Sequence, residues 1–123
     1  MTAQTIELPN HKLGDRWPAG ADETTVLKIG PILINGEAPP NSLFRVEMRF
    51  KQDASRYIID SDPTQRDAPL NITNAATWEA EIPVTQNFLP SAGRWEWDLA
   101  FYDTVNASPL TLFAGTQTVL SQI

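Results

Sequence analysis

The segment GRWEWDLAFYD, residues 93–103, constrains the fold more than any other part of the chain. Apolar and polar side chains alternate along it, which is the period of a β-strand with one buried face and one solvated face. A helix would spread the same apolar side chains around its whole circumference. Because each buried aromatic ring removes about 150–250 Å² from water, we expect this strand at the centre of a β-sandwich. The inward set is Trp95, Trp97, Leu99 and Phe101, and the outward set is Arg94, Glu96, Asp98 and Tyr102.

Two further segments alternate as clearly, and several shorter ones are rich in β-branched residues. The side chains predicted to point inward are Phe44, Val46, Met48 and Phe50 in residues 43–51, and Trp78, Ala80, Ile82 and Val84 in residues 77–84. Shorter strands are predicted at residues 4–8, 24–34, 56–60, 70–73 and 110–120, and one helical turn at residues 85–92. Gly30-Pro31 interrupts the strand at 24–34 and marks a bulge, a bend between sheets or an edge. Seven or eight short strands with turns between them favour an all-β fold, an immunoglobulin-like antiparallel β-sandwich with at most one short helical turn. A small barrel is the alternative.

A chain of 123 residues has the size of one domain, and we predict a single β-sandwich domain over residues 1–123. Residues 1–23 are interpreted as a first strand followed by a surface arm, and residues 53–74 as a polar, loop-rich insertion. Residues 1–10 lack the basic and apolar regions of a secretory signal, so we expect a protein made in the cytoplasm.

The charge balance disfavours two classes of partner. Nine basic and fifteen acidic side chains give a net charge of −6. Nucleic acid and anionic membranes both require a basic surface, so we predict neither as a partner. The chain has no cysteine, which excludes disulfides, thiol catalysis and cysteine-bound metals.

No group of residues in the sequence specifies a reaction. His11 is the single histidine, and no serine lies in the Gly-x-Ser-x-Gly turn of a nucleophile. The acidic residues at 60–67 do not follow the spacing of a calcium loop and are interpreted as a polar turn. We therefore predict no enzyme, catalytic residue, cofactor or metal. Four carboxylates lie on the polar side of alternating strands, and they are Glu79, Glu81, Glu96 and Asp98. We interpret them as part of a solvated sheet face rather than as the two carboxylates of a glycosidase facing each other across a cleft.

The aromatic residues allow two interpretations. Exposed tryptophans would form the stacking platform of a carbohydrate-binding module, but the alternation of Trp78, Trp95 and Trp97 with apolar neighbours favours the core. Trp17, in a polar segment, either plugs the edge of the core or contacts a partner. The residues predicted as candidate partner contacts are Trp17, Arg16, Tyr57, Arg66 and Tyr102.

A longer pattern covers the last two predicted strands. It reads Pro-x-Ala-Gly-x-Trp-x-Trp-Asp-Leu from Pro90 to Leu99 and Leu-x-Leu-x-x-Gly-x-x-x-Val from Leu110 to Val119. This pattern resembles small immunoglobulin-like proteins of tailed bacteriophages, such as the N-terminal domains of baseplate upper proteins and small tail- or fibre-associated proteins. The Gly-Asp-Arg-Trp sequence at residues 14–17 also resembles the opening of that group.

The resemblance implies a function as well as a fold. It implies a virion structural or adaptor protein without a catalytic site, made in the host cytoplasm and located at a tail, baseplate or fibre junction. The implied partners are other virion proteins, in a homo- or hetero-oligomer. Two alternatives stay open, namely a carbohydrate- or peptide-binding β-sandwich module and a capsid decoration protein. We also expect removal of residues 1–21 to prevent assembly while leaving the domain folded.

Overall fold

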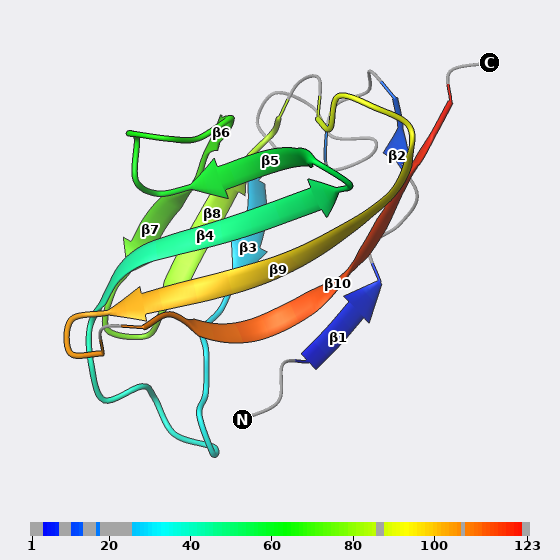
Figure 1. The fold of residues 1–123 in the computed structure, drawn as a ribbon. Coiled ribbons are helices and arrows are strands. Elements are labelled where there is room, and N and C mark those ends of the chain that lie inside the picture. The colour runs from blue at the N-terminus through cyan, green and yellow to red at the C-terminus, as the bar shows by residue number, and fades with distance from the viewer. Residues whose placement is uncertain are drawn as a thin grey trace.

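Two β-sheets packed face to face make up the protein (Figure 1). The computed structural model describes residues 4–7, 11–13, 17, 26–85, 88–106 and 108–121. These described residues contain no helix, and so no helix that could cross a membrane. The strands are β1 (Gln4–Glu7), β2 (His11–Lys12), β3 (Val26–Ile29), β4 (Leu43–Gln52), β5 (Ser55–Asp60), β6 (Ala68–Pro69), β7 (Asn71–Asn74), β8 (Glu79–Pro83), β9 (Gly93–Asp103) and β10 (Leu110–Leu120).

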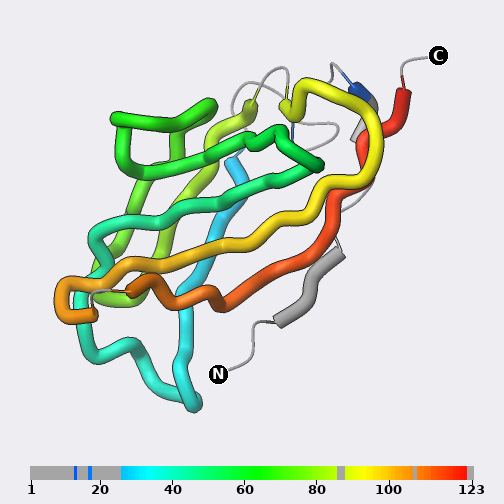
Figure 2. The backbone as a smooth tube through the Cα atoms, viewed as in Figure 1, coloured from blue at the N-terminus to red at the C-terminus, as the bar shows by residue number. Residues whose placement is uncertain are grey.

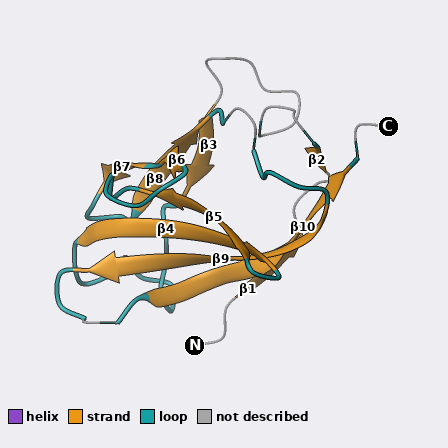
Figure 3. Ribbon diagram, turned by 45° about the horizontal axis from the view of Figure 1, so that its top comes forward, coloured by secondary structure: helices purple, strands orange, loops and turns teal. Residues whose placement is uncertain are grey.

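The strand order is that of an immunoglobulin-like sandwich. The larger sheet runs β1-β10-β9-β4-β5-β6, with β2 also paired to β10, and the smaller sheet runs β3-β8-β7. The smaller sheet lies behind the larger one in Figure 1, and Figure 3 shows the two layers from another side. Strands β4, β9 and β10 correspond to C, F and G of the immunoglobulin fold, and β3, β8 and β7 to B, E and D. Eight of the strands have four residues or more, so the predicted all-β sandwich is confirmed.

The ladders differ from the prediction at the edges of the larger sheet. The pairs β10–β9, β9–β4 and β4–β5 are antiparallel, as predicted. The short strands β1 and β2 instead pair in parallel with β10, and β6 pairs in parallel with β5. The centre of the larger sheet therefore has the predicted antiparallel geometry, and its short edge strands do not.

The central strand has the predicted geometry. β9 lies between β10 and β4, and all four of its inward side chains are buried. Trp78, which precedes β8 in the other sheet, stacks on Phe101 with 5.6 Å between ring centroids. The indole Nε1 of Trp78 donates to the carbonyl oxygen of Asn41 at 2.7 Å. The aromatic core therefore joins the two sheets.

The alternation predicted for residues 43–51 fails at Phe44. Val46, Met48 and Phe50 are buried as predicted, but Phe44 is 57% exposed. The pairing of β4 with β9 shifts register between Leu43 and Arg45, and Leu43 is the buried residue at this end. Such a bulge adds one residue to the strand and turns its side chain away from the core, which explains the outward Phe44.

Trp17 plugs the core, as one of its two interpretations predicted. It is 5% exposed, and its ring stacks on Phe88 at 4.5 Å and meets the edge of Phe50 at 6.3 Å. The Trp17 and Thr85 amides each donate to the other residue's carbonyl oxygen at 2.8 Å. Residues 1–23 thus contribute a core ring, as well as β1 and β2, and are more than a surface arm. Removing residues 1–21 would therefore remove a core ring, which argues against the expectation that the domain stays folded without them.

Other connections also differ from the prediction. Within residues 53–74, interpreted as a loop-rich insertion, β5 and β7 lie at the strands predicted for 56–60 and 70–73, whereas the two-residue β6 was not predicted. The described part of the predicted helical turn at 85–92 is not helical. The strand predicted at 24–34 ends at Ile29, in agreement with the interruption predicted at Gly30-Pro31. Gly30 has a φ of 85°, and a Cβ there would lie 2.3 Å from the Trp78 carbonyl oxygen. Figure 2 shows the following connection, residues 30–42, projecting beyond the sheets at the end where β4 begins.

Candidate functional site

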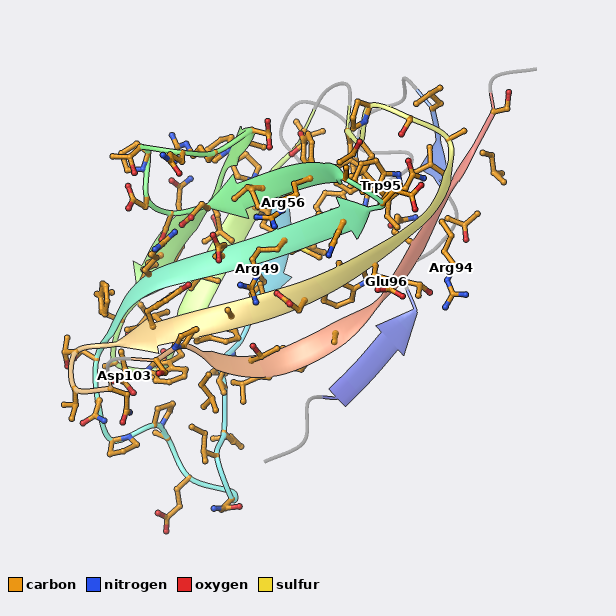
Figure 4. The ribbon with its side chains drawn as sticks, in the orientation of Figure 1. Arg49, Arg56, Arg94, Trp95, Glu96 and Asp103 are labelled. Carbon is orange, nitrogen blue, oxygen red and sulfur yellow. The ribbon has the colours of Figure 1, made fainter. Side chains whose placement is uncertain are left out.

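The outward side of the larger sheet, called here the outer face, carries polar and charged side chains from four strands. Alternation in β4 and β9 predicted its polar character. Figure 4 shows Arg49, Arg56 and Glu96 on this side of the sheet. The outer-face residues are Arg45, Glu47, Arg49 and Lys51 of β4, Arg56, Ile58 and Asp60 of β5, Arg94, Glu96, Asp98 and Tyr102 of β9, and Ala114 and Thr116 of β10.

A ladder of ion pairs crosses the middle of the outer face. Nε and Nη2 of Arg45 donate to Oδ1 and Oδ2 of Asp60 at 3.1 and 2.7 Å. Nε and Nη2 of Arg49 donate to Oδ1 and Oδ2 of Asp98 at 2.7 and 2.9 Å. Glu47 lies between the two arginines, 3.3 Å from Arg45 and 3.6 Å from Arg49. Because a bidentate pair fixes both planar groups, the ladder ties β5, β4 and β9 together.

The surroundings of the ladder raise the pKa of two arginines and one tyrosine. The hydrogen bond to Asp60 raises the pKa of Arg45 above its usual value, and the hydrogen bond to Asp98 does the same for the pKa of Arg49. Burial, helped by the charge of Glu47, raises the pKa of Tyr102. These three groups therefore neither give up nor take up a proton near neutral pH.

An exposed aromatic group lies where β4 begins, and we call Phe44, Arg45 and Tyr102 the aromatic end. The Arg45 guanidinium carbon lies 4.8 Å from the centroid of the Tyr102 ring, within cation–π range. The rings of Phe44 and Tyr102 are 6.1 Å apart, and the Tyr102 hydroxyl donates to Glu47 Oε1 at 3.3 Å. A depression of about 460 Å³ adjoins Phe44 and Arg45. Two of these side chains are fixed by the ladder, so the aromatic end is a rigid surface.

A second depression, of about 590 Å³, lies farther along β4, and we call it the basic depression. Lys51 of β4 and Arg56 of β5 are register partners on its wall. Within the described part of the chain, neither of them makes an ion pair. The outer face thus has a satisfied ladder between an aromatic end and a basic depression.

The structure places two of the predicted partner contacts in the core. Trp17 is buried as described above. Tyr57 is 8% exposed and packs edge-on against Phe50 and Phe88. Burial, helped by the charge of Asp67, raises the pKa of Tyr57 to about 12. Trp17 and Tyr57 are therefore corrected from contact residues to core residues.

The other three predicted contacts fall in different places. Tyr102 belongs to the aromatic end. Arg66 is exposed in the loop after β5, where its Nη1 donates to the carbonyl oxygen of Asp60 at 3.1 Å. Arg16 lies outside the described residues. Among the predicted contacts that the structure describes, Tyr102 is therefore the one that lies on the outer face.

Sequence reasoning placed Lys51 on the polar face, but it missed the exposure of Phe44 and the position of Arg56 opposite Lys51. The amino-acid sequence gives no sign of the bulge, because the alternation continues through Phe44 without a glycine or a proline. The proximity of Lys51 and Arg56 had a signal, since they flank a short turn between two strands. A two-residue connection at Asp53 and Ala54 places them opposite one another.

The other candidate chemistry has structural explanations in the described residues. Asp62 accepts hydrogen bonds from the amide and hydroxyl of Thr64, which lower its pKa, and Asp67 accepts from the Ile58 amide at 2.7 Å. No group of three metal-ligating side chains occurs among the residues that the structure describes. The four tryptophans are at most 6% exposed, so the prediction that Trp78, Trp95 and Trp97 are core residues is confirmed.

Comparisons of this chain with protein-family models, curated proteins and solved structures found no match. Its function is therefore inferred from the outer face. The ladder carboxylates Asp60 and Asp98 each accept hydrogen bonds from an arginine. An exposed aromatic end and a charged depression on one rigid sheet are suited to binding another surface.

Proposed function

We propose that this chain is a non-enzymatic structural or adaptor protein of a bacteriophage tail, baseplate or fibre junction. It contacts other virion proteins through the aromatic end of its outer face. The observation that carries the proposal is the exposure of Phe44 beside Arg45 and Tyr102. The virion location rests on the sequence resemblance, whose residues form β9 and β10.

The aromatic end has the composition of a contact centre. Aromatic and arginine side chains carry much of the binding energy in protein interfaces. Full burial of a phenylalanine side chain contributes about 1.5–3 kcal/mol, and Phe44, being 57% exposed, retains part of that for a partner. An unbroken alternation would have buried this ring, whereas the bulge exposes it and Leu43 is buried instead.

The carbohydrate alternative has less support. A stacking platform needs exposed and coplanar rings, and the tryptophans are buried. The exposed pair Phe44 and Tyr102 is tilted by 56°, which does not offer one flat surface to a sugar. A peptide-binding module would use the same outer face, and a capsid decoration protein differs from a tail protein by its location in the particle.

A complementation experiment tests the proposal. Tagged protein is supplied in trans to a phage that lacks its own copy, and its amount is measured separately in purified tails and heads. We expect the natural chain in tails, and Phe44→Ser reduced there by about tenfold or more, as for loss of an interface anchor. The matched control is Leu120→Ser, which changes another exposed apolar residue at the end of β10 and should incorporate normally.

Each other outcome changes the proposal in a defined way. Absence of the natural chain from particles would refute a virion role, and its presence in heads alone would favour capsid decoration. Equal incorporation of Phe44→Ser and Leu120→Ser would refute the aromatic end as the contact. Thermal unfolding of both variants shows that each is folded before it is compared.

A further inference from the structure

The basic depression is hollow because long and short side chains meet there. Its walls combine charged and apolar residues from β4, β5 and β9, and β10 contributes the small residues Ala114, Gly115 and Thr116. An adjoining depression of about 720 Å³ shares Lys51 and Glu96 with it and adds Arg94. Four of the chain's nine basic residues border these two depressions, and they are Arg49, Lys51, Arg56 and Arg94.

The cations in the basic depression are unequally satisfied. Arg49 directs its guanidinium to Asp98, whereas Lys51 and Arg56 make no ion pair within the described residues. The register places Lys51 and Arg56 directly opposite each other. Like charges in this position destabilise a sheet, so the fold itself gives no reason for the pair. Glu96 is the register partner of Lys51 on β9, but it makes no ion pair in the described structure either.

We infer that Lys51 and Arg56 bind carboxylate side chains of an acidic segment of a partner protein. The inference rests on the proposed function, since it names the chemistry of a second contact on the same outer face. A carboxylate between the two cations removes their mutual repulsion and forms charge-assisted hydrogen bonds with both. Arg94 extends the positive surface along β9 toward the adjoining depression.

The charge distribution favours an acidic protein segment over nucleic acid or a lipid surface. The whole chain has a net charge of −6, which repels an extended polyanion. Glu96 and Asp98 line the same depression and oppose a dense row of phosphates. A peptide with spaced carboxylates places its anions at Lys51 and Arg56 and its backbone amides beside Glu96.

The test uses fluorescence anisotropy to measure the binding of a labelled peptide whose two glutamates are separated by glycines, which matches the spaced carboxylates of the inference. We expect the natural chain to bind at about 20 mM salt and to bind more weakly at about 300 mM, because salt screens exposed charges. The double variant K51Q/R56Q should bind about fivefold to tenfold more weakly, as expected for two solvent-accessible ion pairs. The control K28Q/R66Q removes the same charge from exposed residues outside the depression and should bind as the natural chain does.

Three results would overturn the inference. The first is no binding by the natural chain at low salt, and the second is an equal loss in K51Q/R56Q and K28Q/R66Q. The third is equally tight binding of a hexathymidylate, which would mean that the depression responds to any anion. These failures are separate from failure of the proposed function, which is decided by the incorporation of Phe44→Ser. If the peptide does not bind while Phe44→Ser is excluded from tails, the proposed function stands and this inference is wrong.

Discussion

Replacing Arg45 with methionine tests whether the ion-pair ladder holds the larger sheet together. The side chain of Asp60 is 1% exposed, and in the variant its carboxylate loses both hydrogen bonds from Arg45 and keeps one from the Asp62 amide. Removing one partner of a fully buried ion pair costs about 3–5 kcal/mol. Because the Arg45 side chain is 30% exposed, water reaches the vacated site, and we expect a loss of about 2–3 kcal/mol.

Urea unfolding of a double-mutant cycle measures this loss. The variants are Arg45→Met, Asp60→Leu and the double variant, each compared with the natural chain. Replacing both charged groups leaves no unpaired charge, so the double variant should be more stable than Arg45→Met alone. For a domain of this size, Arg45→Met should also lower the melting temperature by about 10 °C. A loss below about 0.5 kcal/mol, the range of ordinary surface changes, would refute the structural role of the ladder.

Three further predictions concern the core and its edges. Gly30→Ala should destabilise the protein by about 2 kcal/mol or more in urea unfolding, because its Cβ would meet the backbone of Trp78. Gly36 has a similar φ but no atom within 4 Å, so Gly36→Ala should cost only about 1 kcal/mol from backbone strain. Equal losses in the two variants would contradict the close approach at Gly30. Trp17→Ala should lower the free energy of unfolding by about 3–5 kcal/mol in thermal or urea unfolding. A decrease below about 1 kcal/mol would contradict the placement of Trp17 in the core. Burial raises the pKa of Tyr57 from 10.0 to about 12, so the folded state favours the neutral hydroxyl. The stability that this preference contributes is present in full below pH 10 and is lost as the pH rises through about 12. The free energy of unfolding should therefore fall over this range and fall less in Tyr57→Phe; parallel pH profiles would contradict it.

The buried face of a regular strand could be predicted because successive side chains point to opposite sides of the sheet. The inward set of β9 follows directly from Trp95, Trp97, Leu99 and Phe101, and it agrees with the structure. Phe44 shows the limit of this reasoning. A bulge is fixed by how β4 meets Asp103 and Tyr102 across the sheet, and that pairing is not visible in residues 43–51 themselves.

The polar character of the outer face could be predicted, but its pairings could not. Arg49 and Asp98 are 49 residues apart, and the packing of β4 on β9 sets their register. Tyr57 was predicted as a contact residue, whereas its ring packs edge-on against both Phe50 and Phe88. Local alternation therefore predicts the outward side of a regular strand, whereas the pairing between strands sets the bulge at Phe44 and the partners of the outward charges.

Hydroxyl-radical footprinting tests the central claim, that the aromatic end is the contact surface, most directly. The oxidation rates of Phe44 and Tyr102 are compared between the free protein and the protein in assembled tails, with Leu120 as the exposed reference side chain. We predict that Phe44 and Tyr102 are protected in tails and that Leu120 is oxidised equally in both. Protection of Leu120 without protection of Phe44 would contradict the proposed contact.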